Sequence, residues 1–562
     1  MAVANNTLRS RWPLCDKDVK RDNSAMTDDK TDHDVVRHYH DITKHQLQRY
    51  AAGPQALDWD DQPEAFRWFE GAAKTDLPLI ADRLASLYID IYAPDTIEAQ
   101  PLTLENLGGL LELALGLSAW KRYGEARWAL RCNPSSGNLH AEEAYVICNT
   151  LGDLAGGVHH YLSRDHQLEQ RCVFQDDVLP PDTLLIGISA IHWREAWKYG
   201  ERAYRYCQLD TGHALAALRY GAAALGWRVQ LLDRISDSQQ ATLLGLARAA
   251  DFGDAEREHP DLLLHISSGC ARHAVAIDRL IDSVNHGEWS GRANVLSPHH
   301  LHRWPIIDEV SRAARKPVTE AAKANLDARP APLNSPCDLT AAALIRRRRS
   351  AQAFDGQTPI GRDALLRMLD MTLPRPRLPP WDCTPWRDSI NMVLFVHRVH
   401  DLAPGLYALV RNPHSLDAFK SALGREQFQW QQVDACPEHL PLYKLVHADS
   451  QTLAATLSCH QGIAGQSCFS LGMIADTSVL GAGAWHYRRL YWEAGMIGQV
   501  LYLEAEAAGI QGTGIGCYFD DAVHEVLGIQ DKRWQSLYHF TVGKGVFDTR
   551  IQTDPPYAHL QR

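Results

Sequence analysis

Three short segments of the chain hold residue types that can bind a flat or an anionic ligand. Residues 133–138 (NPSSGN) combine small hydroxyl groups, a glycine and two asparagines, which present short donors and backbone N–H groups. Residues 346–350 (RRRRS) place a serine after four arginines, and guanidinium groups match the oxygens of a phosphate. Residues 512–517 (GTGIGC) contain glycines that let a backbone lie against a ligand. The first segment also fits an ordinary turn and the second a solvated basic run, so each signal is weak alone.

Other chemical motifs are missing or poorly formed. Residues 512–517 do not spell GxGxxG, and no βαβ pattern opens the chain, which disfavours a dinucleotide-binding Rossmann domain. Neither HExxH nor GxSxG occurs, so nothing indicates a zinc protease or an α/β-hydrolase. His299, His300 and His302 have no further cysteine or carboxylate at ligand spacing, and we expect an exposed linker there and no metal site.

Composition limits the class of protein that positions these segments. The chain has 562 residues, of which 45% are hydrophobic and 22% charged, as expected for a globular protein of two to four domains. The formal charge of −11 disfavours nucleic-acid binding. The sequence has no apolar run that would span a membrane and no secretory signal at its start. The twelve cysteines include no CxxC pair, so we expect reduced thiols and a cytoplasmic location.

Two parts of the chain resemble each other. Residues 204–227 match residues 487–510 without a gap, pairing Asp210 with Glu493 and ending in Gly226 and Gly509. Small and apolar residues recur there at three- and four-residue spacing, which predicts a long helix closed by a glycine in each part. Upstream, residues 146–158 match residues 395–406, and each predicts a strand, a glycine turn and a second strand. The shared order favours duplication of one α+β unit over chance similarity.

The repeat divides the chain into three regions. Residues 1–32 are polar and charged, and we expect a disordered extension in which Met26 is an alternative start. Residues 33–335 form the first predicted unit, including a linker within residues 297–338 that ends rich in proline and alanine. Residues 336–562 form the second predicted unit.

In combination, the motifs resemble those of FMN-dependent nitroreductases. The RRSxRxF-like run from Arg348, the PSSGN loop and the Gly-rich segment before FDDxVxExLG carry this resemblance. It is closest to the SagB-type dehydrogenases, which are relatives of the thiazoline/oxazoline oxidases, and it covers about residues 35–555. It extends to residues 39–45, 57–59 and 198–206.

The resemblance implies an α+β fold of two tandem nitroreductase-like units, each a mostly antiparallel sheet flanked by helices. Such enzymes are typically homodimers with FMN at the interface, where the subunits supply different walls. This chain splits those walls between its halves, which implies a fused pseudo-dimer with one FMN site. Residues 381–389 lack the Ser-Ser-Gly-Asn loop and residues 81–86 lack Arg-Arg-Ser, so the second site is expected to be eroded. The residues expected to bind FMN are Pro134, Ser135, Ser136, Asn138, Arg348, Arg349, Ser350, Gln352, Gly514, Gly516, Cys517 and Lys544.

The resemblance also implies a role for most of these residues. Arg348 and Lys544 would neutralise the phosphate, and Ser350 would bind phosphate or ribityl oxygens. The loop residues Ser135, Ser136 and Asn138 would bind the isoalloxazine edge. The backbone from Gly514 to Cys517 would face flavin N5 or O4. The third basic position of the motif is Gln352, which removes a positive charge near the ring.

Lys198 and Tyr199 match a Lys-Tyr pair that acts near the substrate in azoline oxidases. A buried lysine with a lowered pKa can act as a base beside a tyrosine that donates a proton. The alternative is the start of a surface helix in which Lys198 pairs with Glu201.

The expected activity is flavin-dependent oxidoreduction by hydride transfer at N5. The substrate is either a heterocycle in a modified peptide or a quinone or nitro compound reduced with NAD(P)H. Further oligomerisation of the pseudo-dimer stays open. The alternative function is a non-catalytic flavin-binding or scaffold protein of a biosynthetic complex.

Overall fold

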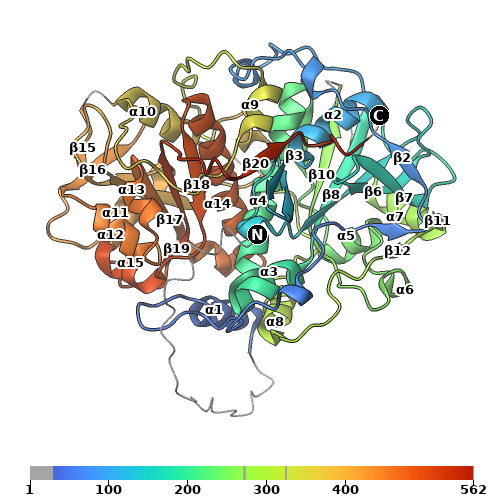
Figure 1. Cartoon of the computed structure of the whole chain (residues 1–562), viewed down its shortest axis with the longest axis horizontal. Coiled ribbons are helices and arrows are strands. Elements are labelled where there is room, and N and C mark those ends of the chain that lie inside the picture. Colours follow the sequence, from blue (N-terminus) through green and yellow to red (C-terminus); the bar gives the residue numbers. More distant parts are fainter. Residues whose placement is uncertain (1–29, 270–273, 323–325, 435, 561–562) are drawn as a thin grey trace.

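The computed structural model describes residues 30–269, 274–322, 326–434 and 436–560, which fold into two α+β units side by side (Figure 1). The first unit contains α1 (Asp32–Ile42), β1 (Phe69–Glu70), β2 (Lys74–Asp76), α2 (Leu104–Ala114), β3 (Leu117–Tyr123), β4 (Ala126–Arg131), β5 (Glu142–Cys148), β6 (Gly157–Leu162), β7 (Gln167–Val173), β8 (Thr183–Ala190), α3 (His192–Tyr199), α4 (Ala203–Ala224), β9 (Arg228–Leu231), α5 (Asp237–Leu243), α6 (Ala249–Phe252), β10 (His259–Ser267), α7 (Ile277–His286), β11 (Glu288–Trp289), β12 (Arg292–Ala293) and α8 (Pro305–Ala313). The second contains α9 (Ala341–Arg347), α10 (Arg362–Met371), β13 (Ile390–Val396), β14 (Gly405–Leu409), α11 (Leu416–Ala422), β15 (Gln431–Gln432), β16 (Leu442–His447), α12 (Gln451–Leu457), α13 (Gly462–Gln466), β17 (Phe469–Asp476), α14 (His486–Ala507), β18 (Gln511–Ile515), α15 (Asp520–Leu527), β19 (Trp534–Gly543) and β20 (Gln552–Asp554).

The two main sheets have the same strand order. The first runs β11-β7-β6-β5-β8-β10-β9, with β2 on β7, and the second runs β15-β16-β14-β13-β17-β19-β18. Their ladders are antiparallel. The predicted strand–turn–strand match is confirmed: Cys148 pairs with Gly157, and Val396 pairs with Gly405. The expected α+β fold of two similar tandem units is therefore the observed architecture.

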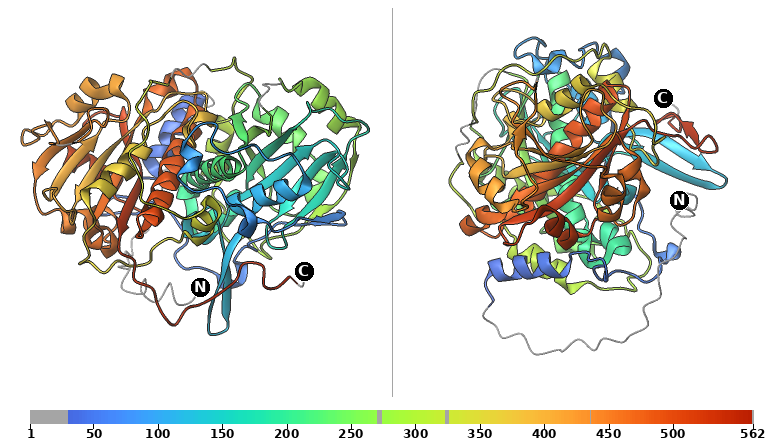
Figure 2. Two further views of the ribbon diagram at one scale, coloured as in Figure 1. Left: turned by 90° about the horizontal axis from the view of Figure 1, so that it is seen from above. Right: turned by 90° about the vertical axis from the view of Figure 1, so that its left-hand side faces the viewer.

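The two central strands are buried on both faces. In β5 and β13 every residue is buried, so neither strand alternates between apolar and polar residues, although β5 begins with the buried acids Glu142 and Glu143. Helix α4 packs on β5 and β8, while α14 packs on β18 and β19. Each sheet thus has its long helix on the side that faces the other unit (Figure 2).

The predicted pair of long helices is confirmed, and the two helices pack against each other. Every residue of α4 is buried, and so are nearly all residues of α14, as in helices at the centre of a core. Gly226 and Gly509 follow the helices with φ of 70° and 73°, a left-handed conformation that favours glycine. The packed helices join both units into one hydrophobic core.

The C-terminal segment crosses from the second unit to the first. Strand β20 pairs with β3, which pairs with β4, so Thr553 lies opposite Lys121 (Figure 1). Tyr557 then donates a hydrogen bond from its hydroxyl to the Ser163 carbonyl and accepts one from the backbone N–H of Leu117 at 2.8 Å. The end of the chain is therefore part of the first unit's structure.

Residues 1–29 of the predicted extension, with Met26, lie outside the described residues, and α1 begins at Asp32 with Thr31 as its N-cap. The predicted linker contains α8, which packs on α1, and then residues 326–338 without a helix or strand. The unit boundary near residue 335 stays a prediction.

Candidate functional site

The NPSSGN loop follows β4 and is anchored on α4. The backbone N–H and the hydroxyl of Ser136 both donate to the Asp210 carboxyl, at 2.9 and 2.8 Å. Ser135 Oγ accepts from the His140 backbone N–H at 2.8 Å, and Asn138 Nδ2 donates to the Ala129 carbonyl at 2.9 Å. Pro134 is buried at the start of the loop. Ser135 and Asn138 thus hold the shape of the loop, and their expected hydrogen bonds to a flavin stay predictions.

The arginine segment of the second unit reaches this loop of the first. Arg348 is buried, and its guanidinium donates to the carbonyls of Arg131 and Cys132, both at 3.3 Å, just before the loop. Arg349 donates to the Ser118 carbonyl at 2.8 Å. Sequence positions more than two hundred residues apart therefore meet at one place.

Arg348 and Arg349 lack a compensating anion. In the described part of the chain neither has a carboxylate within ion-pair distance, and Arg348 Nη1 has no hydrogen-bond partner. Burial lowers the pKa of both guanidinium groups, and for Arg349 the neighbouring Arg348 lowers it further, to about 10. By contrast, Arg347 pairs with Glu506 at 2.7 Å. A buried cation without a partner is costly, so this pair fits an anionic ligand such as a phosphate.

Ser350 and Gly514 are linked through a residue that the sequence analysis missed. Tyr502 of α14 hydrogen-bonds Ser350 Oγ through its hydroxyl at 2.9 Å, and the same hydroxyl accepts from the Gly514 backbone N–H at 2.9 Å. The backbone of Ser350 forms a parallel bridge with Gly512. The Arg348 guanidinium lies 4.9 Å from the Tyr502 ring centre. Tyr502 therefore ties the arginine segment to the Gly-rich segment.

The glycines of the Gly-rich segment make room for tyrosines. A Cβ on Gly514 would lie 1.7 Å from the Tyr538 hydroxyl, and one on Gly516 would lie 2.2 Å from the Tyr206 ring. The Gly516 carbonyl accepts from the Tyr206 hydroxyl at 3.2 Å and from Arg202 at 3.1 Å. Close packing against these tyrosines therefore explains why glycine occupies both positions. The sequence analysis did not predict these contacts, because Tyr206 and Tyr538 come from other elements.

Lys198 and Tyr199 end α3 beside the NPSSGN loop. A Cβ on Gly137 would lie 2.5 Å from the Tyr199 hydroxyl and 2.9 Å from Lys198 Nζ. The Tyr199 and Tyr206 rings lie 4.5 Å apart, which extends this contact to Gly516. Among the described ion pairs there is none between Lys198 and Glu201. Burial lowers the pKa of Lys198, while Glu195 opposes the shift, and burial raises the pKa of Tyr199 well above its usual range.

Buried carboxyl groups lie near the NPSSGN loop. Burial raises the pKa of Asp210 to about 7 and raises the pKa values of Glu142 and Glu195 well above their usual range. The negative charge of Asp210 also raises the pKa of Glu142, whose two oxygens are buried without a hydrogen-bond partner among the described residues. Both Glu195 oxygens are buried without a hydrogen-bond partner among the described residues. The raised pKa values favour the protonated forms of these acids, next to the partly buried Lys198 side chain.

The other predicted site residues lie around the Gly-rich segment. Lys544 is exposed at the end of β19, where its ammonium donates to the Gly509 carbonyl at 3.5 Å. Gln352 is also exposed. It directly follows Ala351, whose backbone N–H donates to the Gly512 carbonyl. Cys517 follows Gly516, and its carbonyl accepts from Gln461 at 3.1 Å.

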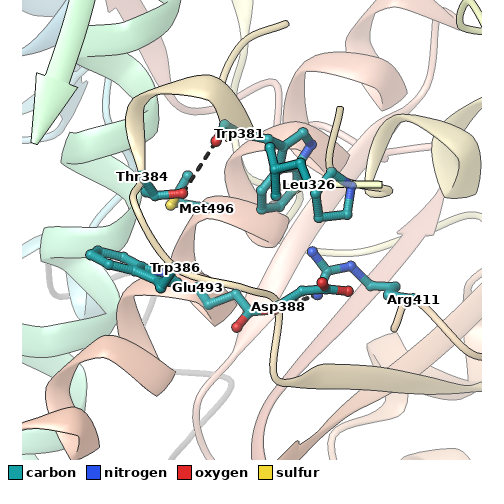
Figure 3. A pocket seen from close by; sticks show the side chains of 9 residues that line it. Leu326, Trp381, Thr384, Trp386, Asp388, Arg411, Glu493 and Met496 are labelled. Atoms are coloured by element: carbon teal, nitrogen blue, oxygen red, sulfur yellow. Dashed lines mark hydrogen bonds and ion pairs between the residues drawn. The ribbon is translucent and has the colours of Figure 1, made fainter. Parts of the chain in front are cut away.

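The corresponding place in the other half has different contacts. Glu493, the counterpart of Asp210, accepts from the Ser389 backbone N–H at 2.9 Å and from Arg411 at 2.5 Å (Figure 3). Trp381, Trp386 and Asp388 line a cavity there of about 10 Å³, and a neighbouring cavity of about 20 Å³ is lined by Leu231. Leu231 occupies the position that Gly514 has in the repeat. Such cavities hold about one water molecule.

His299, His300 and His302 are exposed, as expected for the linker, and His300 hydrogen-bonds Glu256 at 3.0 Å. Each helix in the described residues is too short or too polar to cross a membrane.

Comparisons with known proteins bear on the fold of the chain. Residues 411–544, in the second unit, match the model of the family described as "Nitroreductase family". A protein from Anabaena variabilis ATCC 29413 described as a nitroreductase is similar over 91% of this chain and 99% of its own, with 21% identity and a TM-score of 0.64. A search of curated proteins finds no match.

Two further solved structures are similar over less of the chain. The E. coli microcin synthetase McbBCD, in complex with truncated pro-MccB17, covers 43% of this chain and 94% of its own, with 16% identity and a TM-score of 0.27. A protein from Exiguobacterium sibiricum 255-15, described as a nitroreductase in complex with FMN, covers 38% and 92%, with 11% identity and a TM-score of 0.22. The chain thus contains a nitroreductase family domain at residues 411–544, within a fold of two tandem nitroreductase-like units.

Proposed function

We propose that the protein is an FMN-dependent oxidoreductase with one flavin site, built between the two units. The observation that carries this proposal is the buried Arg348 beside the half-buried Arg349, two cations without a carboxylate within ion-pair distance among the described residues, next to the NPSSGN loop of the other unit. FMN would supply hydride transfer at N5.

The residues present fit the phosphate end of such a cofactor. Arg348 has a free Nη1 donor, Arg349 adds a second positive charge, and Ser350 adds a hydroxyl. Lys544 is exposed and can move toward the same phosphate, because its stem is flexible. Gln352 stands at the third basic position of the motif, so one expected positive charge near the flavin ring is missing. The missing charge disfavours an anionic reduced flavin.

Lys198 and Tyr199 are proposed as the acid–base pair at the reacting end. The lowered pKa of Lys198 favours a neutral amine that can take a proton, and the raised pKa of Tyr199 keeps its hydroxyl protonated. Gly137 holds this end of the loop close to both side chains. Tyr538 and Tyr206 pack against Gly514 and Gly516, respectively.

The finer assignment is a SagB-like dehydrogenase or oxidase that acts on a heterocycle in a modified peptide. The sequence motifs support it, and they equally support an NAD(P)H-dependent reductase of quinones or nitro compounds. We further infer a fused pseudo-dimer that arose by duplication, supported by the matching strand orders and the packed helices α4 and α14. A cytoplasmic location stays the prediction from cysteine usage.

FMN occupancy tests the phosphate site. The variants Arg348→Gln and Arg349→Gln should each load FMN about tenfold or more weakly, since each loses a charge-assisted hydrogen bond. Arg347→Gln is the matched control, because Arg347 already pairs with Glu506. Absorbance of released FMN gives occupancy, and titration gives the dissociation constant. If the Arg348 variant binds FMN as well as the wild type does, Arg348 does not bind the FMN phosphate.

Anaerobic mixing with NADH and NADPH then separates the activities. Bleaching of bound flavin by either nucleotide supports a reductase, and bound FMN that neither bleaches supports an oxidase that passes electrons to oxygen. If the folded wild-type chain does not take up FMN, both flavin-dependent activities are excluded and the alternative function as a scaffold protein is supported.

A further inference from the structure

Two cysteines from separate elements meet next to the Gly-rich segment. Cys459 follows α12, and Cys517 follows β18. Their thiols are hydrogen-bonded to each other. The Phe519 backbone N–H donates to the Leu457 carbonyl at 2.8 Å, and Gln461 donates to the Cys517 carbonyl at 3.1 Å. Hydrogen bonds on both sides of the thiols therefore fix the two segments together.

A histidine from the first unit completes the group. The His45 side chain is hydrogen-bonded to the Cys517 thiol. His45 Nδ1 accepts from the Ala51 backbone N–H at 2.9 Å, so the proton of the neutral ring is on Nε2 and is available to donate to sulfur. Hydrogen bonds of 3.0 Å in both directions between His45 and Asp520 fix the backbone beside the ring.

The surroundings of Cys517 favour the thiolate. The hydrogen bond from the Cys459 thiol lowers the pKa of Cys517 most, burial opposes this, and His45 and Arg202 lower it further, to about 5. Burial and the partner thiol raise the pKa of Cys459 well above its usual range. The partner thiol and His45 thus favour the thiolate form at Cys517 over Cys459, which suits an attacking Cys517 and a resolving Cys459.

The two cysteines also differ from most other cysteines of the chain in exposure. Cys459 and Cys517 are partly exposed, whereas Cys132, Cys148, Cys172, Cys207, Cys337, Cys383 and Cys468 are buried. Cys436 is the other half-buried free thiol among the described residues. The groups that shift the pKa of Cys436 include neither another cysteine nor a histidine.

We propose that Cys459 and Cys517 form a redox-active dithiol that reduces organic disulfides of low molecular weight. The Cys517 thiolate attacks one sulfur of the disulfide R–S–S–R, forming a mixed disulfide and releasing one thiolate, which takes a proton from solvent. The Cys459 thiol then loses its proton and attacks the Cys517 sulfur, forming the Cys459–Cys517 bond and releasing the second R–SH. The substrate disulfide gains two electrons from the cysteine pair and two protons, one from solvent and one from Cys459. An external dithiol reverses the change, so the activity does not rest on FMN.

The test uses the full chain, reduced and then exposed to oxidised glutathione. Peptide mass spectrometry should show a Cys459–Cys517 disulfide in the wild type and in the matched control Cys436→Ser. Cys459→Ser should trap glutathione on Cys517, because the resolving thiol is missing. Cys517→Ser should leave Cys459 largely unmodified.

The pH dependence of the first step tests His45. His45→Gln should raise the pH at which glutathione attaches to Cys517 in the Cys459→Ser background, while circular dichroism checks the fold. A folded wild type whose Cys459 and Cys517 stay reduced, or whose Cys436 reacts as fast as Cys517, would overturn the proposal. Because the readout is sulfur chemistry, its failure is distinct from a failure to load FMN.

Discussion

Gly495 of α14 lies directly on Gly212 of α4, at the centre of the molecule. A Cβ on Gly495 would lie 2.9 Å from the Gly212 Cα and 2.2 Å from the Leu209 carbonyl oxygen, and a Cβ on Gly212 would lie 2.3 Å from the Trp492 carbonyl oxygen. The repeated helices thus touch backbone to backbone at the same repeat position. This contact sets how closely the two walls of the proposed flavin site approach each other.

We predict that Gly495→Ala separates α4 from α14. The added methyl group cannot be accommodated without a backbone shift, so the free energy of unfolding should fall by about 1–3 kcal/mol. Denaturant unfolding followed by fluorescence measures the loss. Gly481→Ala is the matched control, since a Cβ there meets nothing within 4 Å. Equal stability of the two variants would show that the helices are not in contact in solution.

Asp520 joins the two units through a buried ion cluster. Its carboxylate accepts from Arg205 at 2.8 Å and Arg202 at 3.1 Å, both at the start of α4. Asp520→Ala should lower the free energy of unfolding by about 3–5 kcal/mol, because it leaves two buried cations without their partner. The neighbouring Asp521 is exposed, so Asp521→Ala should change stability by less than about 1 kcal/mol. Thermal unfolding compares the two variants, and similar melting temperatures would contradict the prediction.

Asp210 should make stability fall as pH rises toward neutrality. Its pKa is about 7 in the folded chain, against an ordinary value of 3.8, so the folded state holds a proton that the unfolded state releases. Its contribution is complete below about pH 4 and is lost as pH rises through about 7. Asp210→Asn should flatten this slope in urea unfolding at pH 5 and pH 8. The exposed variant Asp363→Asn serves as control, and an unchanged slope in Asp210→Asn would count against the proton assignment.

Lys198→Met should leave flavin bound and slow turnover by about 10²–10⁴-fold, since it removes the proposed base but no phosphate contact. The wild-type rate should increase with pH as the Lys198 amine loses its proton, and the variant should lack this increase. Flavin absorbance and turnover at several pH values measure both effects, with the exposed Lys420→Met as control. If Lys198→Met only lowers stability, its role is structural.

The sequence determined the elements and their repetition. Apolar spacing and the glycines at 226 and 509 predicted both long helices, and Gly157 and Gly405 marked the matching strand pairs. These features depend on local backbone preferences and on periodicity, which a single chain displays without its partners. The sequence also showed that Asp210 and Glu493 occupy the same position in the repeat. It did not show that Asp210 accepts a hydrogen bond from Ser136 of the loop.

The tertiary structure decided which side chains meet. The contacts of Arg348 and Arg349 with the carbonyls of residues 118, 131 and 132 depend on segments that lie far apart in the sequence. Tyr502, Tyr206 and Tyr538 carry no motif, and their contacts with the Gly-rich segment depend on how α4, α14 and β19 pack. The thiol pair of Cys459 and Cys517 was hidden for the same reason. Charge compensation, burial and thiol reactivity are properties of neighbours in space, and the order of residues along the chain does not fix those neighbours.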